Sequence, residues 1–194
     1  GPKPASDVRS FAIELANRLV NDFKVKMIVV ACNTAAAVAL QELQETLPVP
    51  VIGVVEPGAR ALVRVTKNNR VAVIGTAGTI SSGAYDKAVA HVSSDVVLTA
   101  AACPGFVEFV ERDETTGVAV TELAEKLLAP VRNADVDALL LGCTHYPYLS
   151  VVISQVMGAG VKLVNGADET ANSVRDALVK NNIARSVGAS SKGT

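Results

Sequence analysis

The chain has 194 residues, which is enough for one full hydrophobic core or two smaller ones. Hydrophobic residues make up 49% of it and charged residues 19%, proportions that indicate a folded protein rather than a disordered one. The formal net charge is -1, and lysine and arginine form no long run, so we expect no nucleic acid as a partner.

No apolar stretch reaches the roughly 18 residues that a membrane-spanning helix needs. The first residues also lack the charged and then apolar order of a signal peptide, so we expect a cytoplasmic protein with no membrane partner. Three cysteines, an odd number, predict neither a disulfide framework nor a paired-cysteine metal site. Without a nucleotide-binding glycine motif or a recognisable pyridoxal-phosphate lysine, we predict no cofactor and no metal.

Short apolar runs rich in Val, Ile and Leu alternate with longer amphipathic segments along the chain. This pattern is typical of parallel strands that are buried on both faces and connected by helices, so it predicts an α/β fold. The tail 186–194 has almost no apolar content, and we expect it to fray. In chain order we expect helix 7–21, strand 25–31, helix 35–46, strand 51–55, helix 57–66, strand 70–75, helix 80–91, strand 95–100, helices 106–112 and 118–132, strand 136–142, helix 148–157, strand 161–164 and helix 169–180.

Two cysteines, Cys32 and Cys143, each stand at the end of a predicted strand. In parallel α/β sheets, ligands bind outside the carboxyl ends of the strands, where helix N-termini expose N–H groups to anions. Small polar residues that could hold a carboxylate or an amine follow each cysteine, namely Asn33, Thr34, Thr144 and His145. Because similar polar residues follow both cysteines, we predict one site in which the two clusters form facing walls.

A thiol has a reference pKa of about 8.5, so a helix N-terminus or a nearby imidazolium can make it a general base near neutral pH. His145 is close enough in sequence to assist Cys143 in this way. Taken singly, a strand-end cysteine is ordinarily a small apolar core residue, and a lone histidine ordinarily satisfies local hydrogen bonds. The third cysteine, Cys103, lacks polar neighbours, and we predict a structural role for it.

The segments ACNTA (31–35) and GCTHYP (142–147) resemble the two signature segments of the glutamate racemase family, within the aspartate/glutamate racemases. The two cysteines occur in the family's order, and chance coincidence of both motifs is improbable. The resemblance extends to VVEPG (54–58), VIGTAGTISSGAY (73–85), ACP (102–104) and DETA (168–171).

This resemblance implies two lobes with mainly parallel sheets flanked by helices and an active site in the cleft between them. We place the first lobe at 1–55 plus 165–194 and the second at 56–164. The implied activity is cofactor-independent interconversion of L- and D-glutamate by two thiols, which supplies D-glutamate for peptidoglycan synthesis. Cys32 would face the D-isomer and Cys143 the L-isomer.

The resemblance also implies further site residues. Substrate contacts are predicted for Asn33, Thr34, Thr76, Thr144 and His145. Two carboxylates, Glu56 and Asp168, together with His145, could tune the thiols or the amine, but each carboxylate is equally well explained as a solvated loop charge or a helix cap.

Family members normally begin with a strand that ends in Asp-Ser-Gly, followed by a Tyr-Gly pair, and both motifs line the pocket. This chain opens at GPKP, which resembles the residues just after that Tyr and makes Gly1 a further candidate substrate contact. Alternatively, Gly1 and Pro2 are the remnant of a cleavage site. We therefore expect the first lobe to be incomplete at its N-terminus, and we predict catalysis for the full-length parent.

Two alternative functions stay open at this point. A related aspartate or hydantoin racemase, or a maleate isomerase, would also use paired cysteines, although the THYP (144–147) and NTA (33–35) residues favour glutamate. The second alternative is a non-catalytic binding protein, or a fragment, that retains the fold. The sequence also leaves open whether the chain forms a homodimer.

Overall fold

The computed structural model describes residues 3–185. Gly1 and the tail 186–194, for which the sequence makes predictions, lie outside the described residues. Within residues 3–185, no helix is both long and apolar enough to cross a membrane. The strands are β1 (Ile28–Val30), β2 (Val51–Gly53), β3 (Arg70–Gly75), β4 (Val97–Ala102), β5 (Ala138–Gly142) and β6 (Lys162–Val164). The helices are α1 (Ala5–Asn21), α2 (Asn33–Thr46), α3 (Val55–Val65), α4 (Ala77–Ser81), α5 (Ala84–Val92), α6 (Phe106–Glu111), α7 (Val118–Arg132), η1 (Tyr146–Leu149), α8 (Ser150–Met157) and α9 (Ala167–Lys180).

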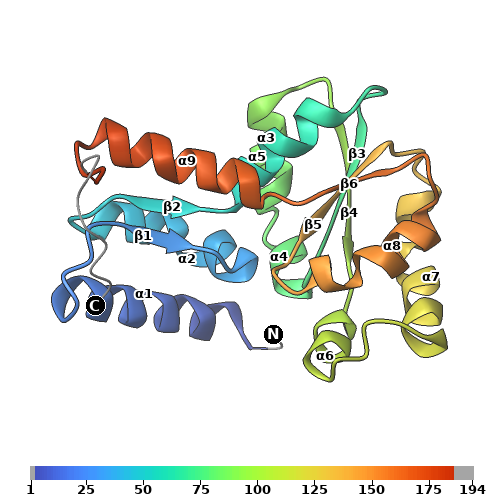
Figure 1. Ribbon diagram of the computed structural model, residues 1–194, viewed down its shortest axis with the longest axis horizontal. Helices are drawn as coiled ribbons and strands as arrows, with labels where there is room; N and C mark the ends of the chain where they lie inside the picture. The colour runs from blue at the N-terminus through green and yellow to red at the C-terminus, as the bar shows by residue number, and fades with distance from the viewer. Residues whose placement is uncertain (1–2, 186–194) are drawn as a thin grey trace.

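The strands form two parallel sheets. One has the two strands β1 and β2, and the other has four strands in the order β4-β3-β5-β6. Figure 1 shows the small sheet with α1, α2 and α9 at the left of the view, and the large sheet with the other helices at the right. The structure confirms the predicted α/β fold of parallel sheets flanked by helices.

Two hydrophobic cores cover the two faces of the large sheet. Successive residues of a strand point to opposite faces, so Val71 and Val73 join one core while Ala72 and Ile74 join the other. The first core continues into the small sheet and α2, and the second is closed by helices that include α7 and α8. Because the first core includes residues of both sheets, the two lobes pack against each other through apolar side chains.

One predicted helix is wrong in its extent. The sequence pattern predicts a single helix over 80–91, but the chain forms α4 and α5 with a break at Gly83. Gly83 has φ +65°, a left-handed conformation that glycine adopts without a steric penalty. The left-handed backbone at Gly83 separates α4 from α5. The spacing of apolar residues does not reveal such a break.

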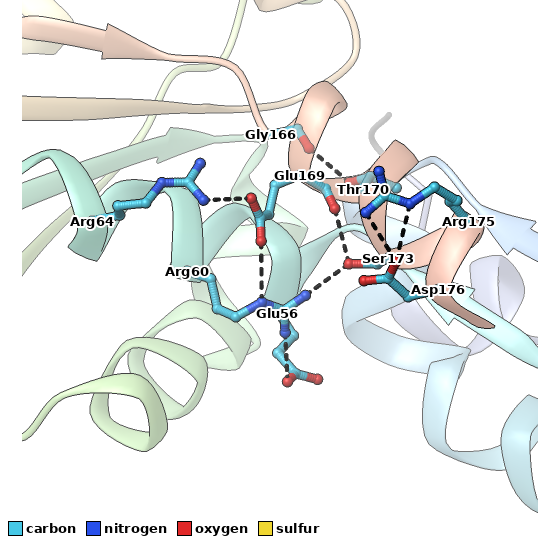
Figure 2. A network of polar contacts seen from close by, with 9 residues as sticks. All are labelled: Glu56, Arg60, Arg64, Gly166, Glu169, Thr170, Ser173, Arg175 and Asp176. Carbon is cyan, nitrogen blue, oxygen red and sulfur yellow. Dashed lines mark hydrogen bonds and ion pairs between the residues drawn. The ribbon is translucent and has the colours of Figure 1, made fainter. Parts of the chain in front are cut away.

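A group of charged side chains joins α3 to α9. Figure 2 shows Arg60 and Arg64 of α3 reaching the carboxylate of Glu169 in the first turn of α9. Arg64 Nη1 lies 2.8 Å from Glu169 Oε2, and Arg60 Nε lies 3.5 Å from Glu169 Oε1. Arg60 also donates to Ser173 Oγ at 2.8 Å. These contacts fix the start of α9 relative to α3.

Glu169 is well placed to be ionised in the folded protein. Its side chain is only 15% exposed. The hydrogen bond from Arg64 is the main cause that lowers the pKa of Glu169 below its ordinary value, and Arg60 adds to it. Partial burial acts in the opposite sense but is outweighed. A carboxyl pKa that is lower in the folded state adds stability above the unfolded pKa of about 4.3. That stability is lost as the pH falls through the folded pKa.

We predict that Glu169→Gln lowers the free energy of unfolding at pH 7 by about 1 kcal/mol, the upper range for a partly exposed ion pair. The difference from the parent protein shrinks as the pH falls below about 4, because the parent carboxylate is then protonated too. Urea unfolding at pH 7 and pH 3.5 measures both values. Asp176→Asn is the matched control, since the Arg175–Asp176 pair in Figure 2 lies on the same helix and is exposed. Equal destabilisation by the two variants would contradict a stabilising role for the contacts of Glu169 with Arg60 and Arg64.

Candidate active site

The register of the large sheet brings distant parts of the chain to one edge. Gly75 at the end of β3 pairs with Ala102 at the end of β4 and with Gly142 at the end of β5. The residues that follow these three positions are Thr76, Cys103 and Cys143. The strand order also places β3 between β4 and β5, so the chain changes direction across the sheet here. Such a switch point is where parallel α/β folds bind ligands.

Gly142 lets Cys143 sit close to the neighbouring strand. A Cβ atom at Gly142 would lie 2.8 Å from the carbonyl oxygen of Ile74 and 2.9 Å from Val73 Cγ2. The carbonyl belongs to the backbone of the adjacent strand and cannot move away cheaply. A side chain at position 142 would therefore displace the strand end that carries Cys143.

A cavity of about 510 Å³ lies where the two sheets and α9 meet. Its walls include Val29 on β1, Asn33 at the start of α2, and Cys143 and Thr144 after β5. The remaining lining residues are Ala31, Val54, Gly58, Tyr85, Leu140, Leu141, Pro147, Asn165, Gly166, Ala167, Thr170, Ala171 and Val174. The walls are thus mainly apolar with a few polar groups, the usual make-up of a small-molecule site.

The predicted site residues divide into two groups. Asn33, Cys143 and Thr144 line the cavity, whereas Cys32, Thr34, Thr76 and His145 are not among its lining residues. Cys32 is exposed at the N-terminus of α2, where its backbone is extended with φ -75° and ψ 120°. The first-turn N–H groups of a helix have no partners within the helix, so this position favours negative charge.

Thr34 and Thr76 meet although they come from different lobes of the predicted architecture. Their hydroxyl oxygens are 2.8 Å apart, and each also contacts the hydroxyl of Thr79, at 3.1 and 3.0 Å. Three hydroxyl groups in a triangle can each donate one hydrogen bond and accept one. This closed ring ties the start of α2 to the loop that begins α4.

Cys143, His145 and Glu111 form a chain of contacts. His145 Nδ1 lies 3.8 Å from Cys143 Sγ, and His145 Nε2 lies 2.6 Å from Glu111 Oε1. A carboxylate can only accept, so Nε2 carries a proton, and in the neutral form of the ring Nδ1 can accept one. Thr144 Oγ1, at 3.4 Å from Nδ1, is a second neighbour of that nitrogen. The arrangement is suited to moving a proton between the thiol and the imidazole.

The protonation of Cys143 is set by its surroundings. Its side chain is buried, and this burial is the main cause that raises the pKa of the thiol above its ordinary value. Hydrogen bonds from the backbone N–H groups of His145 and Tyr146 oppose that rise. The charge of Cys32 acts in the same sense as burial. A negative charge on Cys32 therefore favours the protonated form of Cys143.

Cys103 has the structural surroundings that its sequence context predicts. It is 1% exposed, and burial raises its pKa to about 12. Its carbonyl oxygen accepts a hydrogen bond of 3.0 Å from the Tyr146 hydroxyl. A thiol that stays protonated in an apolar core is a poor base.

Glu56 and Asp168 lie away from the cavity. Glu56, in the first turn of α3, is exposed and pairs with Arg60 at 2.8 Å. Asp168 is exposed in the first turn of α9 and borders a separate, smaller hollow. Both positions suit an acidic residue because the helix N-terminus favours negative charge. Across the described part of the chain, no three His, Cys, Asp or Glu side chains are grouped so that they could hold a metal ion.

The sequence did not predict several residues of the site, among them the cavity residue Asn165 and two residues that contact predicted site residues. Glu111 ends a short helix and carried no motif, so only folding reveals its contact with His145. Tyr85 lies within the family segment 73–85, but nothing in the sequence shows that its hydroxyl reaches Asn33.

Known proteins match both the sequence and the fold. The family model described as Asp/Glu/Hydantoin racemase matches residues 2–174. A glutamate racemase of Bacillus cereus is 45% identical over 178 residues, covering 92% of this chain and 66% of that protein. The crystal structure of the Francisella tularensis glutamate racemase in complex with D-glutamate has a TM-score of 0.87 at 29% identity, covering 96% of this chain and 69% of the other. That of the Thermus thermophilus glutamate racemase in complex with beta-chloro-D-alanine has a TM-score of 0.81 at 43% identity, covering 96% and 68%.

The fold and the cavity define a two-lobed α/β protein with a thiol in the wall of its cleft. With the matches above, the chain belongs to the Asp/Glu/Hydantoin racemase family. This confirms the resemblance on which the cysteine motifs were interpreted. The chain spans about two thirds of the length of the curated glutamate racemases that it matches.

The different burial of the three cysteines predicts an order of chemical modification in the native protein. Iodoacetamide should modify the exposed Cys32 first and Cys143 more slowly, because burial both shields Cys143 and raises its pKa. Cys103 should stay unmodified until the chain unfolds. Mass spectrometry of the peptides measures the three rates, and labelling in denaturant is the control. Native labelling of Cys103 as fast as that of Cys32 would refute this structure of the site.

Proposed function

We propose that the full-length protein interconverts L- and D-glutamate without a cofactor, with Cys32 and Cys143 as the two acid/base groups. The observation that carries the proposal is geometric: Cys143 lines the cavity, and so does Asn33, the residue that follows Cys32. The charge of Cys32 also adds to the burial that raises the pKa of Cys143. Cys32 begins a helix beside the small sheet, and Cys143 follows a strand of the large sheet. Two coupled thiols from different lobes suit a substrate bound between them.

Racemisation needs a base on one face of the α-carbon and an acid on the other. One thiol must be ionised and the other protonated in each productive state, and their roles exchange with the direction of the reaction. The coupling of Cys32 and Cys143 favours such singly ionised states over the state with two thiolates. The mainly apolar cavity supplies the dry surroundings in which hydrogen bonds stabilise a carbanionic transition state most strongly.

His145 serves the thiol of Cys143 in this proposal. With Nε2 bonded to Glu111, the ring can take the proton of Cys143 on Nδ1 and return it later. The carboxylate of Glu111 stabilises the imidazolium that results. Asn33 and Thr144 line the cavity and are the proposed substrate contacts there, while Thr34 and Thr76 hold the wall beside them. The exposed Glu56 and Asp168 take no part.

Glutamate is the proposed substrate because the matched relatives are glutamate racemases and one of them is solved with D-glutamate. We propose that the product D-glutamate supplies peptidoglycan synthesis and that the protein acts in the cytoplasm. We propose the same lobe boundaries as the sequence predicts: the first lobe has residues 1–55 and 165–194, and the second has residues 56–164. The ring of Thr34, Thr76 and Thr79 is then a contact between the two lobes. A homodimer stays a prediction that sedimentation can test.

The basic test is exchange of the α-proton of glutamate in deuterated water by the purified full-length protein, with no cofactor added. A racemase incorporates deuterium into both enantiomers, whereas a non-catalytic binding protein incorporates none. Activity that depends on added pyridoxal phosphate would overturn the proposal. Faster exchange of aspartate than of glutamate would favour the related racemases instead.

We predict that replacing each thiol by serine separates the two directions. A glutamate analogue with a leaving group on its β-carbon needs only the first proton abstraction, because the electrons then expel the leaving group. Serine is a far weaker acid than cysteine and its anion is nearly absent at neutral pH. Cys32→Ser should therefore keep elimination from the L-isomer and lose it from the D-isomer, and Cys143→Ser should do the reverse. Racemisation should fall in both variants.

Cys103→Ala is the control for this experiment and should keep elimination from both isomers, because Cys103 lies in the core. If both serine variants lost elimination equally for both isomers, the two-base assignment would fail. A loss in Cys103→Ala as deep as in Cys32→Ser would show that the wrong pair of thiols was chosen.

We predict that Glu111→Gln slows proton abstraction from L-glutamate about tenfold, or about 1.4 kcal/mol in activation free energy. Glutamine can still accept a hydrogen bond from His145, but it stabilises an imidazolium less than a carboxylate does. Abstraction from D-glutamate should change less, since His145 contacts Cys143. Glu114→Gln is the matched control, because Glu114 lies nearby, is exposed and pairs with Arg112. Deuterium incorporation from each enantiomer gives the two rates, and equal effects of the two variants would rule out this role.

A further inference from the structure

Tyr85 is a buried residue that connects α5, which packs on the large sheet, to the start of α2 beside the small sheet. It belongs to α5, is 3% exposed, and lines the cavity that Asn33 and Cys143 also line. Its hydroxyl donates a hydrogen bond of 2.5 Å to Oδ1 of Asn33 at the start of α2. Burial is the main cause that raises the pKa of Tyr85 above its ordinary value, with the charge of Cys143 adding to it. The phenol therefore keeps its proton at neutral pH and can donate.

This hydrogen bond selects one of the two orientations of the Asn33 amide. No other group in residues 3–185 is hydrogen-bonded to the Tyr85 hydroxyl. If the amide were reversed, its NH₂ group would donate to the phenol oxygen, and the phenol proton would be buried without an acceptor. An unpaired buried donor costs free energy that the observed orientation avoids. The amide therefore turns its oxygen to Tyr85.

The orientation decides what Asn33 offers to a ligand. Asn33 lines the cavity, and within the described residues nothing accepts a hydrogen bond from its Nδ2. The described residues also include no buried polar side-chain atom without a partner, so this nitrogen is accessible. With the oxygen engaged by Tyr85, the amide presents N–H donors to the cavity. Donors bind a carboxylate oxygen and repel an ammonium group.

We propose that Tyr85 is a positioning residue that holds the Asn33 amide with its N–H groups toward the cavity, so that Asn33 binds a carboxylate of the substrate rather than its ammonium group. The inference rests on the proposed function for the identity of the substrate. It resolves a choice between carboxylate and amine that the sequence leaves open. The hydrogen bond itself can be tested without any activity.

Tyr85→Phe removes only the phenol oxygen. Each bound carboxylate then leaves the Asn33 oxygen unpaired against a phenyl ring, so the KM for both glutamate enantiomers should rise about tenfold, or about 1.4 kcal/mol. The value of kcat should change less than threefold, because Tyr85 touches no reacting atom. Tyr146→Phe is the matched control: this phenol is also buried and donates one hydrogen bond, to the Cys103 carbonyl outside the cavity. It should lose stability without the rise in KM.

A ligand without an amine separates the two contacts. Glutarate is a dicarboxylate that lacks the ammonium group of glutamate, and its inhibition constant should weaken in Tyr85→Phe by the same factor as the KM. Unchanged glutarate inhibition would show that Tyr85 does not prepare Asn33 for a carboxylate, and the inference would be wrong. Asn33→Asp keeps an acceptor for Tyr85 but removes the donors and adds a negative charge, so glutarate binding should be lost. Retained binding in Asn33→Asp would likewise overturn the inference.

Neutron diffraction of the full-length protein without ligand tests the orientation directly. We expect deuterons on the side of the Asn33 amide that faces the cavity, and a deuteron between Tyr85 and Asn33 Oδ1. An amide nitrogen facing Tyr85 would refute the inference even if the protein is a glutamate racemase. Conversely, a protein that neither racemises nor binds glutamate would refute the proposed function, while the diffraction result would still decide the orientation of Asn33.

Discussion

The aligned ends of the three strands β3, β4 and β5 are the constraint on which the site depends. Parallel pairing of Gly75 with Ala102 and with Gly142 requires that the next residue of each strand emerges at the same edge. Cys143 takes its position from this register, and the close approach of Gly142 to Ile74 leaves little room for any other arrangement. The cavity lies beside the end of β5, between this strand, the small sheet and α9.

The small sheet contributes the facing wall, and polar contacts fasten it to the large one. The hydrogen bond between Tyr85 and Asn33 and the ring of Thr34, Thr76 and Thr79 both act at the start of α2. Both contacts are buried or partly buried, where a hydrogen bond is strong and an unpaired group is costly. They therefore hold the start of α2, and with it Cys32, in a defined place relative to Cys143. The shared apolar core beneath them gives this arrangement its stability.

The three cysteines show how one residue type acquires different properties from its position. Cys32 is exposed at a helix N-terminus, Cys143 is buried beside an imidazole and backbone N–H groups, and Cys103 is enclosed by the core. Cys103 and Cys143 directly follow strands of the large sheet, whereas Cys32 follows β1 of the small sheet. The chemistry differs because burial, neighbouring charge and available donors differ, and each of these is a property of the folded chain.

The sequence by itself determined the α/β class, the positions of most helices and strands, and the family, because apolar runs report buried strands and the two cysteine motifs are specific. It also separated Cys103 from the other thiols by the lack of polar neighbours. It did not show the break at Gly83, which depends on one backbone angle, nor the partners of His145 and Asn33. Glu111 and Tyr85 are 34 and 52 residues from those partners along the chain. Only the packing of α6 against η1, and of α5 near the start of α2, brings them into contact. Hydrogen bonds between distant residues follow from tertiary geometry and not from local pattern.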